Sequence, residues 1–329
     1  MLLYLAGYLD VKRQEMIADK AAQMVLTGRG RDANWTWVRP NNFLFSFAFE
    51  GAKESARHFC AQPHRRIFID SGAYSVWTLG AEVDLGEYIT FCKEIQGLAK
   101  CPVVFVALDV IPGKFGETPT PAEKEKACEE GWANYQVMKQ EGIYPCLPTF
   151  HQGEHIRWLN RIADDCDYFA MSHSKRADER AENFDWYRRN FQHIGLTKKI
   201  HGLGVASTKL MKGFPFFSVD SSWWTIPGRF HLRPSSRKLI SLKQWEKWGL
   251  ERGLDTQYLK AMLGFGTADP DGNFGAYWLD TLAMGVEVET QAKITEFWRE
   301  KGVVWDDDVY RGAKLLADEP IGVSKQAEG

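Results

Sequence analysis

The chain has 329 residues, which corresponds to about two domains of ordinary size or to one large α/β barrel. It carries 41 Lys and Arg residues against 43 Asp and Glu residues, and this net charge of −2 excludes binding of nucleic acid through overall positive charge. Hydrophobic residues make up 44% of the chain and charged residues 26%, a balance that is typical of a globular protein with a sizeable core. Aromatic residues reach 13%, which permits surfaces that stack on bases or sugars.

The first residues, Met1–Tyr8, are apolar over about one strand length and are followed by charged residues. They predict a buried strand and no leader sequence. No apolar run approaches the roughly 20 residues that a membrane span requires. The six cysteines include no Cys-x-x-Cys pair, so neither a zinc ribbon nor a disulfide framework is indicated, and we expect a cytoplasmic protein.

Short apolar runs alternate with longer amphipathic stretches along the first two thirds of the chain. The runs number about eight and predict strands at Leu2–Tyr8, Phe43–Phe49, Arg66–Ile69, Val103–Leu108, Tyr144–Phe150, Tyr168–Met171, Ile200–Val205 and Phe216–Val219. They are continuous, as in parallel strands that are buried on both faces. The amphipathic stretches predict helices at Leu85–Leu98, Pro121–Glu141, His155–Ala163 and Asn183–His193. This alternation predicts a (β/α)8 TIM barrel, since an open doubly wound sheet would have a glycine-rich turn after the first strand.

The strand pattern stops after Ser221. We therefore expect a barrel over residues 1–240, a mostly helical C-terminal extension over 241–318, and a disordered tail over 319–329. The helical segments of the extension are predicted at Leu242–Leu250, Thr256–Leu263 and Ala276–Lys301.

Three aspartates directly follow predicted strands: Asp70, Asp109 and Asp220. An aspartate in this position is also a preferred N-cap for the next helix, but the segment after Asp220 is a poor helix start. In a barrel, the ends of the strands form the active-site rim. Asp70 and Asp220 could form the carboxylate pair of a retaining reaction at a glycosidic carbon, and Asp109 with Gln152 could read a purine edge.

Other barrel chemistries are less well supported by the residues. The first predicted strand does not end in the His-x-His of metal-dependent amidohydrolases, and no predicted strand contains a lysine for Schiff-base chemistry. His151, His155 and His173 could ligate a metal, but their spacing matches no recognised site. We expect no metal and no cofactor.

Glycines and cations accompany these acids. Gly202 and Gly204 follow the seventh predicted strand and would let the backbone approach a ligand, although a tight turn without a ligand explains them equally well. After Asp220 come paired aromatic rings and a basic cluster that suit a nucleic-acid backbone and an extruded base: Trp223, Trp224, Arg229, Arg233, Arg237 and Lys238.

The order of these motifs resembles the tRNA-guanine transglycosylase superfamily over roughly residues 40 to 240. Asp70-Ser71-Gly72-Ala73-Tyr74-Ser75 is similar to the family's Asp-Ser-Gly-Gly-(Phe/Tyr)-Gln motif, in which the aspartate is the general acid and base. His201–Val205 and Val219-Asp220-Ser221 resemble its Met-Gly-Val-Gly and Phe-Asp-Cys blocks, in which the aspartate is the nucleophile.

The same resemblance implies roles for the remaining rim residues. Asp109 takes the place of the aspartate that recognises the base, and Gln152-Gly153 matches the Gln-Gly pair that reads the purine. Ser172 and His173 fall where the family places a Gly-Gly-Leu floor beneath the base. The substrate-binding set implied in this way is Ser71, Gly72, Tyr74, Asp109, Gln152, Gly153, Ser172, His173, Gly202 and Gly204.

Departures from the family point to one of its branches. No cysteine follows Cys166, so the zinc site of the tRNA-type members is missing, and Ser75 and Val110 replace a Gln and a Glu of the family motifs. A zinc-less chain of this kind looks more like the DNA-modifying branch of phages and bacterial genomic islands, which exchanges guanine for a 7-deazaguanine.

The resemblance therefore implies a DNA-guanine transglycosylase that inserts a base such as 7-cyano-7-deazaguanine through a covalent ester between Asp220 and C1′. Its partners would be DNA and the free deazapurine, in the cytoplasm of a host if the protein is phage-encoded, and family members often form homodimers. The alternatives are the same chemistry on tRNA, a hydrolytic N-glycosidase, and a non-catalytic barrel that binds nucleic acid.

Overall fold

The computed structural model describes most of the first 225 residues and parts of the remainder. The described residues are 1–7, 11, 14–15, 17–18, 41–79, 82–114, 117–173, 180–225, 233–235, 238–240, 274–305 and 310–312. The helices predicted at Leu242–Leu250 and Thr256–Leu263, and the tail predicted over 319–329, lie outside them.

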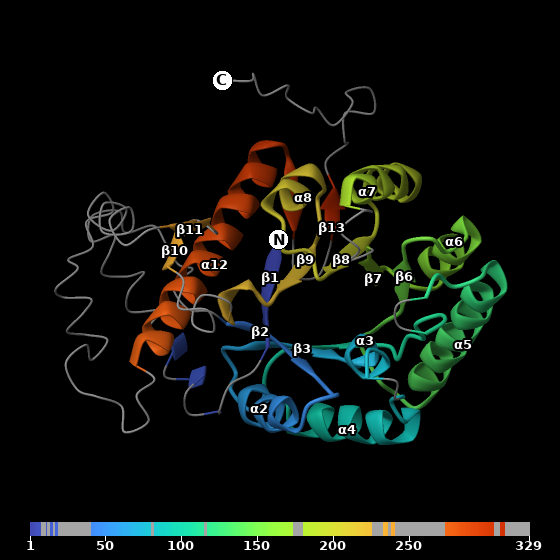
Figure 1. The fold of residues 1–329 in the computed structure, drawn as a ribbon, viewed down its shortest axis with the longest axis horizontal. Helices are drawn as coiled ribbons and strands as arrows, with labels where there is room; N and C mark the ends of the chain where they lie inside the picture. Colours follow the sequence, from blue (N-terminus) through green and yellow to red (C-terminus); the bar gives the residue numbers. More distant parts are fainter. Residues whose placement is uncertain are drawn as a thin grey trace.

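Nine parallel strands form one sheet that curves into a nearly closed barrel (Figure 1). In chain order they are β1 Leu2–Ala6, β2 Asn42–Ser46, β3 Arg66–Asp70, β4 Val103–Val106, β5 Cys146–Leu147, β6 Thr149–His151, β7 Tyr168–Ser172, β8 Lys199–Leu203 and β9 Ser218–Ser221. Pro148 alone separates β5 from β6, and β5 pairs with β4 whereas β6 pairs with β7. This one segment therefore joins the two edges of the sheet, and the predicted α/β barrel of the TIM type is confirmed at this level.

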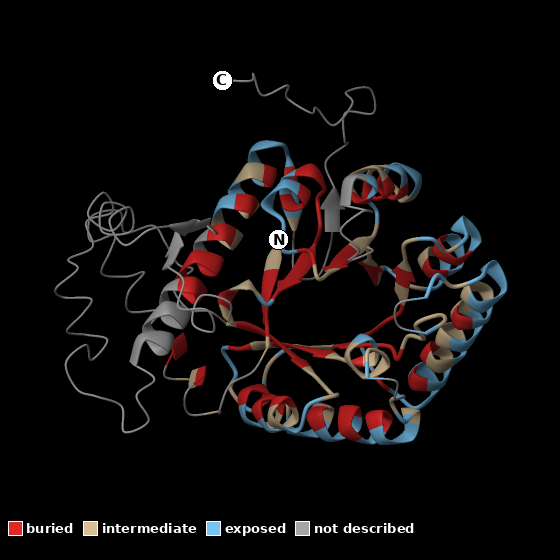
Figure 2. Cartoon of the chain, viewed as in Figure 1, coloured by how far each residue is buried: buried red, intermediate tan, exposed pale blue. Residues whose placement is uncertain are grey.

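Helices cover the outside of the barrel (Figure 1). They are α2 Glu50–Cys60, α3 Ala73–Trp77, α4 Leu85–Leu98, α5 Pro121–Gln140, α6 Ile156–Asp165, α7 Arg180–Ile194, α8 Thr208–Gly213 and α12 Phe274–Glu300, with a 3-10 turn η1 at Trp223–Thr225. Local signals begin two of them: Asp84 caps α4, and Thr120 with Glu123 forms a capping box at α5. Figure 2 shows the buried residues of the longer helices α2, α4, α5 and α6 on the side that faces the strands, whereas the short helix α3 has no buried residue.

Side chains of each strand alternate between two apolar layers. Leu3 and Leu5 of β1 belong to the layer between strands and helices, whereas Tyr4 packs with Phe68 in a second layer inside the barrel. Because side chains two residues apart on a strand share a face, Asp70 lies on the same side of β3 as Phe68. The apolar filling of the barrel thus ends at a rim of polar residues.

Helix α12 starts well beyond residue 240, and it packs against the barrel at β1, α8 and η1. Gln291 fixes the contact, because its Oε1 accepts hydrogen bonds from the Leu3 backbone N–H at 2.7 Å and from Asn42 Nδ2 at 2.9 Å. Glu287 of the same helix is fully buried and accepts a hydrogen bond from the Ser221 hydroxyl. The division at residue 240 into a barrel and an extension stays a prediction.

Three-residue strands form two small antiparallel pairs, β10 Arg233–Ser235 with β11 Lys238–Ile240 and β12 Val303–Trp305 with β13 Tyr310–Gly312.

Within the part of the chain that the structure describes, no helix combines the length and the apolar character that crossing a membrane requires.

We expect Gln291→Leu to lower the free energy of unfolding by about 2 kcal/mol, because the Leu3 N–H and the Asn42 amide would lose their shared acceptor in a partly buried place. Urea unfolding followed by circular dichroism measures the change. Glu296→Gln on the exposed side of the same helix is the control, with an expected change below about 0.5 kcal/mol. Equal effects of the two substitutions would mean that α12 does not hold the N-terminal strands.

Candidate active site

Three aspartates gather at the carboxyl-terminal rim of the barrel, as predicted from their places after strands. Asp70 ends β3, Asp109 follows β4, and Asp220 lies within β9. The charges of Asp109 and Asp220 both raise the pKa of Asp70, which shows that the three carboxylates share one electrostatic environment.

Asp70 has a pKa raised to about 7, first by burial and then by the negative charges of Asp109 and Asp220. Two neighbouring groups favour its ionised form and oppose the shift: the Gly72 backbone N–H donates a hydrogen bond to Oδ2 at 3.1 Å, and the Ser46 side chain lowers the pKa to a smaller extent. Near neutral pH, Asp70 therefore holds a proton in a large fraction of molecules. A carboxyl group in this state can act as a general acid and, once it has given up the proton, as a general base.

Gly72 is required where it stands. Its φ is 78°, and a Cβ atom there would lie 2.5 Å from Ala48 Cβ and 2.6 Å from Ser46 Oγ. Only glycine fits this turn, which aims its own N–H at Asp70.

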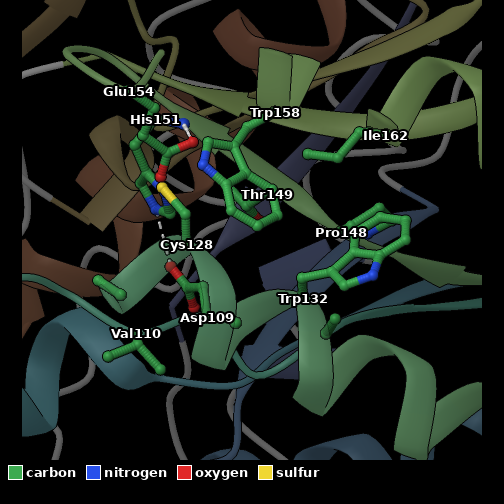
Figure 3. A pocket seen from close by; sticks show the side chains of 13 residues that line it. Asp109, Val110, Cys128, Trp132, Pro148, Thr149, His151, Glu154, Trp158 and Ile162 are labelled. Atoms are coloured by element: carbon green, nitrogen blue, oxygen red, sulfur yellow. Dashed lines mark hydrogen bonds and ion pairs between the residues drawn. The ribbon is translucent and has the colours of Figure 1, made fainter. Parts of the chain in front are cut away.

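Asp109 is one end of a hydrogen-bonded chain of charged groups. Its Oδ2 lies 2.9 Å from His151 Nε2, and His151 Nδ1 lies 2.9 Å from Glu154 Oε1 (Figure 3). Burial alone would lower the pKa of His151, but Glu154 and Asp109 outweigh it and raise the pKa to about 10. His151 is therefore an imidazolium that donates to both carboxylates. The partners of His151 are not predicted from the sequence, and the spacing His151-x-x-Glu154 is the signal that could have revealed its pairing with Glu154.

Ser71 orients the Asp109 carboxylate from the side opposite His151. Its side chain is fully buried, and its hydroxyl donates to Asp109 Oδ1 at 3.2 Å. Contact of Ser71 with a substrate stays a prediction.

A small pocket adjoins Asp109, His151 and Glu154 (Figure 3). Its volume of about 30 Å³ is room for about two water molecules. The wall is completed by side chains from α5 and α6, among them Cys128, Trp132, Trp158 and Ile162. Among the described residues, no group of three or more His, Cys, Asp or Glu side chains has an arrangement that could hold a metal ion.

Asp220 is held through one of its two carboxylate oxygens. Its Oδ1 accepts a hydrogen bond from the Gly204 N–H at 2.6 Å and lies 3.4 Å from His201 Nε2. Its Oδ2 has no hydrogen-bond partner among the described residues, and 12% of the side chain is exposed. One oxygen of Asp220 is thus fixed, and the other is left for a reaction.

Gly202 within β8 and Gly204 just after it have different tasks. Gly204, with a φ of 66°, supplies the N–H that holds Asp220. The missing side chain of Gly202 makes room for its neighbours, because a Cβ atom there would lie 2.6 Å from Val205 Cγ2 and 3.0 Å from Phe216. Contact of the Gly202 and Gly204 backbone with a substrate stays a prediction.

The other predicted base-binding residues lie at the ends of neighbouring strands. The Gln152 backbone N–H donates to the Ser172 carbonyl at 2.9 Å, and Gly153 takes a φ of 95°. His173 Nδ1 lies 3.1 Å from the Tyr187 hydroxyl. The structure thus brings the strand ends of β6 and β7 together, and contact of these residues with a base stays a prediction.

Predicted stacking residues divide into exposed and buried rings. Tyr74 on α3 is 42% exposed. Trp223 is partly buried against the core, and Trp224 is fully buried with its Nε1 donating to the Ala6 carbonyl at 2.9 Å. Trp224 has no free face for an extruded base, so we correct that prediction and assign it to the core.

The predicted basic cluster is described only in part. Arg229 and Arg237 lie outside the described residues. Arg233 lies on β10 and Lys238 on β11, and these strands form an antiparallel pair. A nucleic-acid contact by this cluster stays a prediction.

We expect the stability gain from Asp70→Asn to grow with pH. Because the folded-state pKa of about 7 lies above the unfolded value of about 3.9, folding stability contributed by Asp70 is present at low pH and is lost as the pH rises towards 7. Removing the carboxyl should raise the free energy of unfolding by about 2 kcal/mol more at pH 8 than at pH 5. Urea unfolding at both pH values measures this, with the exposed helix cap Asp84→Asn as the control. A pH-independent difference for Asp70→Asn would contradict the raised pKa.

Glu154→Gln should lower the pKa of His151 by about one unit or more, because the substitution removes one of the two carboxylates that stabilise the imidazolium. Titration of ¹⁵N-labelled histidine by NMR measures the shift. Glu141→Gln, which breaks the exposed pair of Glu141 with Lys93, should leave His151 unchanged. If His151 titrates near pH 6.5 in the unsubstituted protein, the charged chain described above does not exist.

Comparisons with known proteins do not identify a family for this chain. No protein-family model matches it, and a search of curated proteins gives no match. The assignment of a function therefore depends on the geometry of the rim and on the motif resemblance.

Proposed function

We propose that the protein is a DNA-guanine transglycosylase that replaces guanine in DNA with a 7-deazaguanine base. The proposal depends on one observation, that two aspartates at the same rim differ in their surroundings. Asp70 has a pKa of about 7 and can give and take a proton, whereas Asp220 is fixed through Oδ1 and keeps Oδ2 available. Double displacement at a glycosidic carbon needs these two functions in two separate carboxyl groups.

In the first half of the reaction, Asp220 Oδ2 forms a bond to C1′ of the target deoxyguanosine while the bond from C1′ to N9 breaks. Asp70 donates its proton to the departing guanine. In the second half, N9 of the incoming deazapurine gives its proton to Asp70 and bonds to C1′. The ester bond breaks, and its electron pair returns to Asp220. One N-glycosidic bond replaces another, so the overall exchange is nearly thermoneutral.

Asp109 is suited to read the edge of a guanine-like base. Each of its oxygens accepts one protein hydrogen bond, from Ser71 and from His151. A carboxylate oxygen has two lone pairs, so each oxygen can accept a second bond from N1–H or from the exocyclic amino group of the base. The hydrogen bond from the His151 imidazolium to Oδ2 holds the Asp109 carboxylate in place for this recognition.

DNA is the proposed polymer because the motif resemblance points to the DNA-modifying branch. A guanine in duplex DNA must leave the stack before a rim aspartate can reach its C1′. Tyr74 presents an exposed ring on α3, two residues beyond Gly72. We assign Tyr74 as the residue that stacks on the extruded base.

The test measures release of labelled guanine from duplex DNA and from a tRNA transcript, with and without 7-cyano-7-deazaguanine. We expect release from DNA that depends on the deazapurine. Asp220→Ala should lower the rate by about 1,000-fold or more, because it removes the nucleophile. Asp84→Asn replaces an exposed helix cap with another good cap and should retain full activity.

Each other outcome selects a different function. Release from tRNA alone would make the protein a tRNA enzyme, and release without the deazapurine would make it a hydrolase. No release from either polymer by the folded protein would overturn the proposal and leave a nucleic-acid-binding barrel. Full activity of Asp220→Ala would refute the assigned nucleophile.

A further inference from the structure

A column of polar side chains lies inside the barrel beneath Asp220. The Tyr168 hydroxyl of β7 is 2.6 Å from the Ser218 hydroxyl of β9, and Ser218 Oγ is 2.7 Å from His201 Nδ1 of β8. His201 Nε2 then lies 3.4 Å from Asp220 Oδ1. The strand register explains the column, because His201 pairs with Ser218, and Asp220 is two residues further along the same face of β9.

Asp220 is the group that the Nε2 atom of His201 faces. The residue is fully buried, and Nε2 makes no hydrogen bond within the described part of the chain. The ring is stacked on Phe68, with centroids 4.1 Å apart and an angle of 23° between the planes. A buried nitrogen without a partner is costly, so its placement beside the proposed nucleophile calls for an explanation.

The protonation state of His201 follows from its surroundings. Burial lowers its pKa, and this effect outweighs the opposing influence of Asp220, so the ring is neutral near pH 7. A neutral ring carries one proton. If Nδ1 held it, the lone pair of Nε2 would face a carboxylate oxygen. The favourable arrangement has Ser218 donating to Nδ1 and Nε2–H directed at Asp220, and Tyr168 completes it by donating to Ser218.

We propose that Tyr168, Ser218 and His201 form a positioning relay that holds Asp220 Oδ1 and stabilises the carboxylate each time Asp220 is released from its ester. This role rests on the proposed function, because it takes Asp220 as the nucleophile. A distance of 3.4 Å is long for a hydrogen bond, and catalytic hydrogen bonds often shorten only in the reacting complex.

The relay acts mainly on the second half of the reaction. When N9 of the incoming base bonds to C1′, the bond from C1′ to Oδ2 breaks and the electron pair passes to the Asp220 carboxylate. The Nε2–H of His201 stabilises the charge that develops and so makes the carboxylate a better leaving group. No proton is transferred along the relay. The proton of the incoming base passes to Asp70, and the hydrogen bonds of Tyr168, Ser218 and His201 keep the same donors throughout.

Among the described residues, other groups also influence Asp220. Asp70 faces it across the rim, the Gly204 N–H holds the same Oδ1, and the hydroxyl of Tyr187 on α7 lies within its electrostatic reach. Of these groups, Gly204 alone donates a hydrogen bond to Asp220. Removal of the His201 donor therefore leaves the carboxylate oxygen with a single donor.

The first experiment needs no substrate. Long-range ¹H–¹⁵N NMR spectra of histidine-labelled protein, with the His201 signals assigned by the spectrum of His201→Gln, should show a neutral ring protonated at Nε2 from pH 6 to 8. Asp220→Asn should shift the Nε2 signal, because the group that faces it loses its charge. A ring protonated at Nδ1, or signals that Asp220→Asn does not move, would overturn the relay whether or not the protein exchanges bases.

The second experiment compares two substitutions that separate the ends of the imidazole. His201→Gln keeps an N–H donor at the place of Nε2, whereas His201→Asn keeps only a group near Nδ1. We expect His201→Asn to slow the breakdown of the covalent ester, and to increase its steady-state amount, by about 10- to 100-fold. His201→Gln should remain within about threefold of the unsubstituted protein. Rapid-quench gels with labelled DNA measure both steps.

Tyr168→Phe tests the far end of the relay, and Tyr135→Phe is its control. Tyr135 on α5 is also a buried tyrosine, and its hydroxyl donates a hydrogen bond to Asp165 Oδ2 at 2.7 Å, but it lies in the layer between strands and helices. Tyr168→Phe should slow ester breakdown severalfold, and Tyr135→Phe should not. Equal losses in His201→Gln and His201→Asn would indicate a structural role and refute the relay. If Asp220→Ala is active, the proposed function fails. The NMR experiment then still tests the contact between His201 Nε2 and Asp220.

Discussion

Burial of carboxylates close together at one rim is the constraint on which the rest of the site depends. Burial first, and then the charges of Asp109 and Asp220, raise the pKa of Asp70 to about 7. Asp70 therefore differs from an exposed aspartate in holding a proton near neutral pH. The proposed division of roles, with Asp70 as the acid and Asp220 as the nucleophile, starts from this difference.

The neighbouring groups preserve this difference between the aspartates. The positively charged His151 lies between Asp109 and Glu154 and donates a hydrogen bond to each carboxylate, whereas the neutral His201 lies under Asp220. Gly72 and Gly204 each aim a backbone N–H at one aspartate, and at Gly72 a side chain would collide with Ala48. The site is therefore organised mainly by hydrogen bonds between neighbouring groups at the ends of the strands, above the packed interior of the barrel.

Much of the fold was predictable from the sequence because its signals are local. Each predicted strand overlaps an observed one, since continuous apolar runs are what a barrel strand buried on both faces requires. Helix α2 was not predicted, although its buried residues Ala52, Ala56 and Phe59 recur at helical spacing. The split of one strand into β5 and β6 depends on Pro148, which lacks the N–H that a continuous ladder needs. The packing of α12 on β1 joins segments that are far apart in the chain, and no local pattern shows it.

The acids of the site were predictable, whereas their partners were not. Asp70 and Asp220 lie at the carboxyl-terminal ends of β3 and β9, and Asp109 lies shortly after β4, so position along the chain alone brings them to the rim. The contact of His151 with Asp109, and that of His201 with Asp220, depend on the register between neighbouring strands. Trp224 was misassigned because its sequence neighbours are polar and basic, although its indole packs into the core beside β1.

The central claim is that Asp220 forms a covalent bond with the sugar, and one measurement tests it directly. The protein is incubated with guanine-containing DNA in the absence of an incoming base, denatured with acid and digested with trypsin and a nuclease, and its peptides are weighed by mass spectrometry. We predict a nucleotide adduct on Asp220, in the peptide Gly213–Arg229. An adduct on the peptide Ile67–Lys93, which carries Asp70, or guanine exchange without any adduct, would contradict the assigned nucleophile.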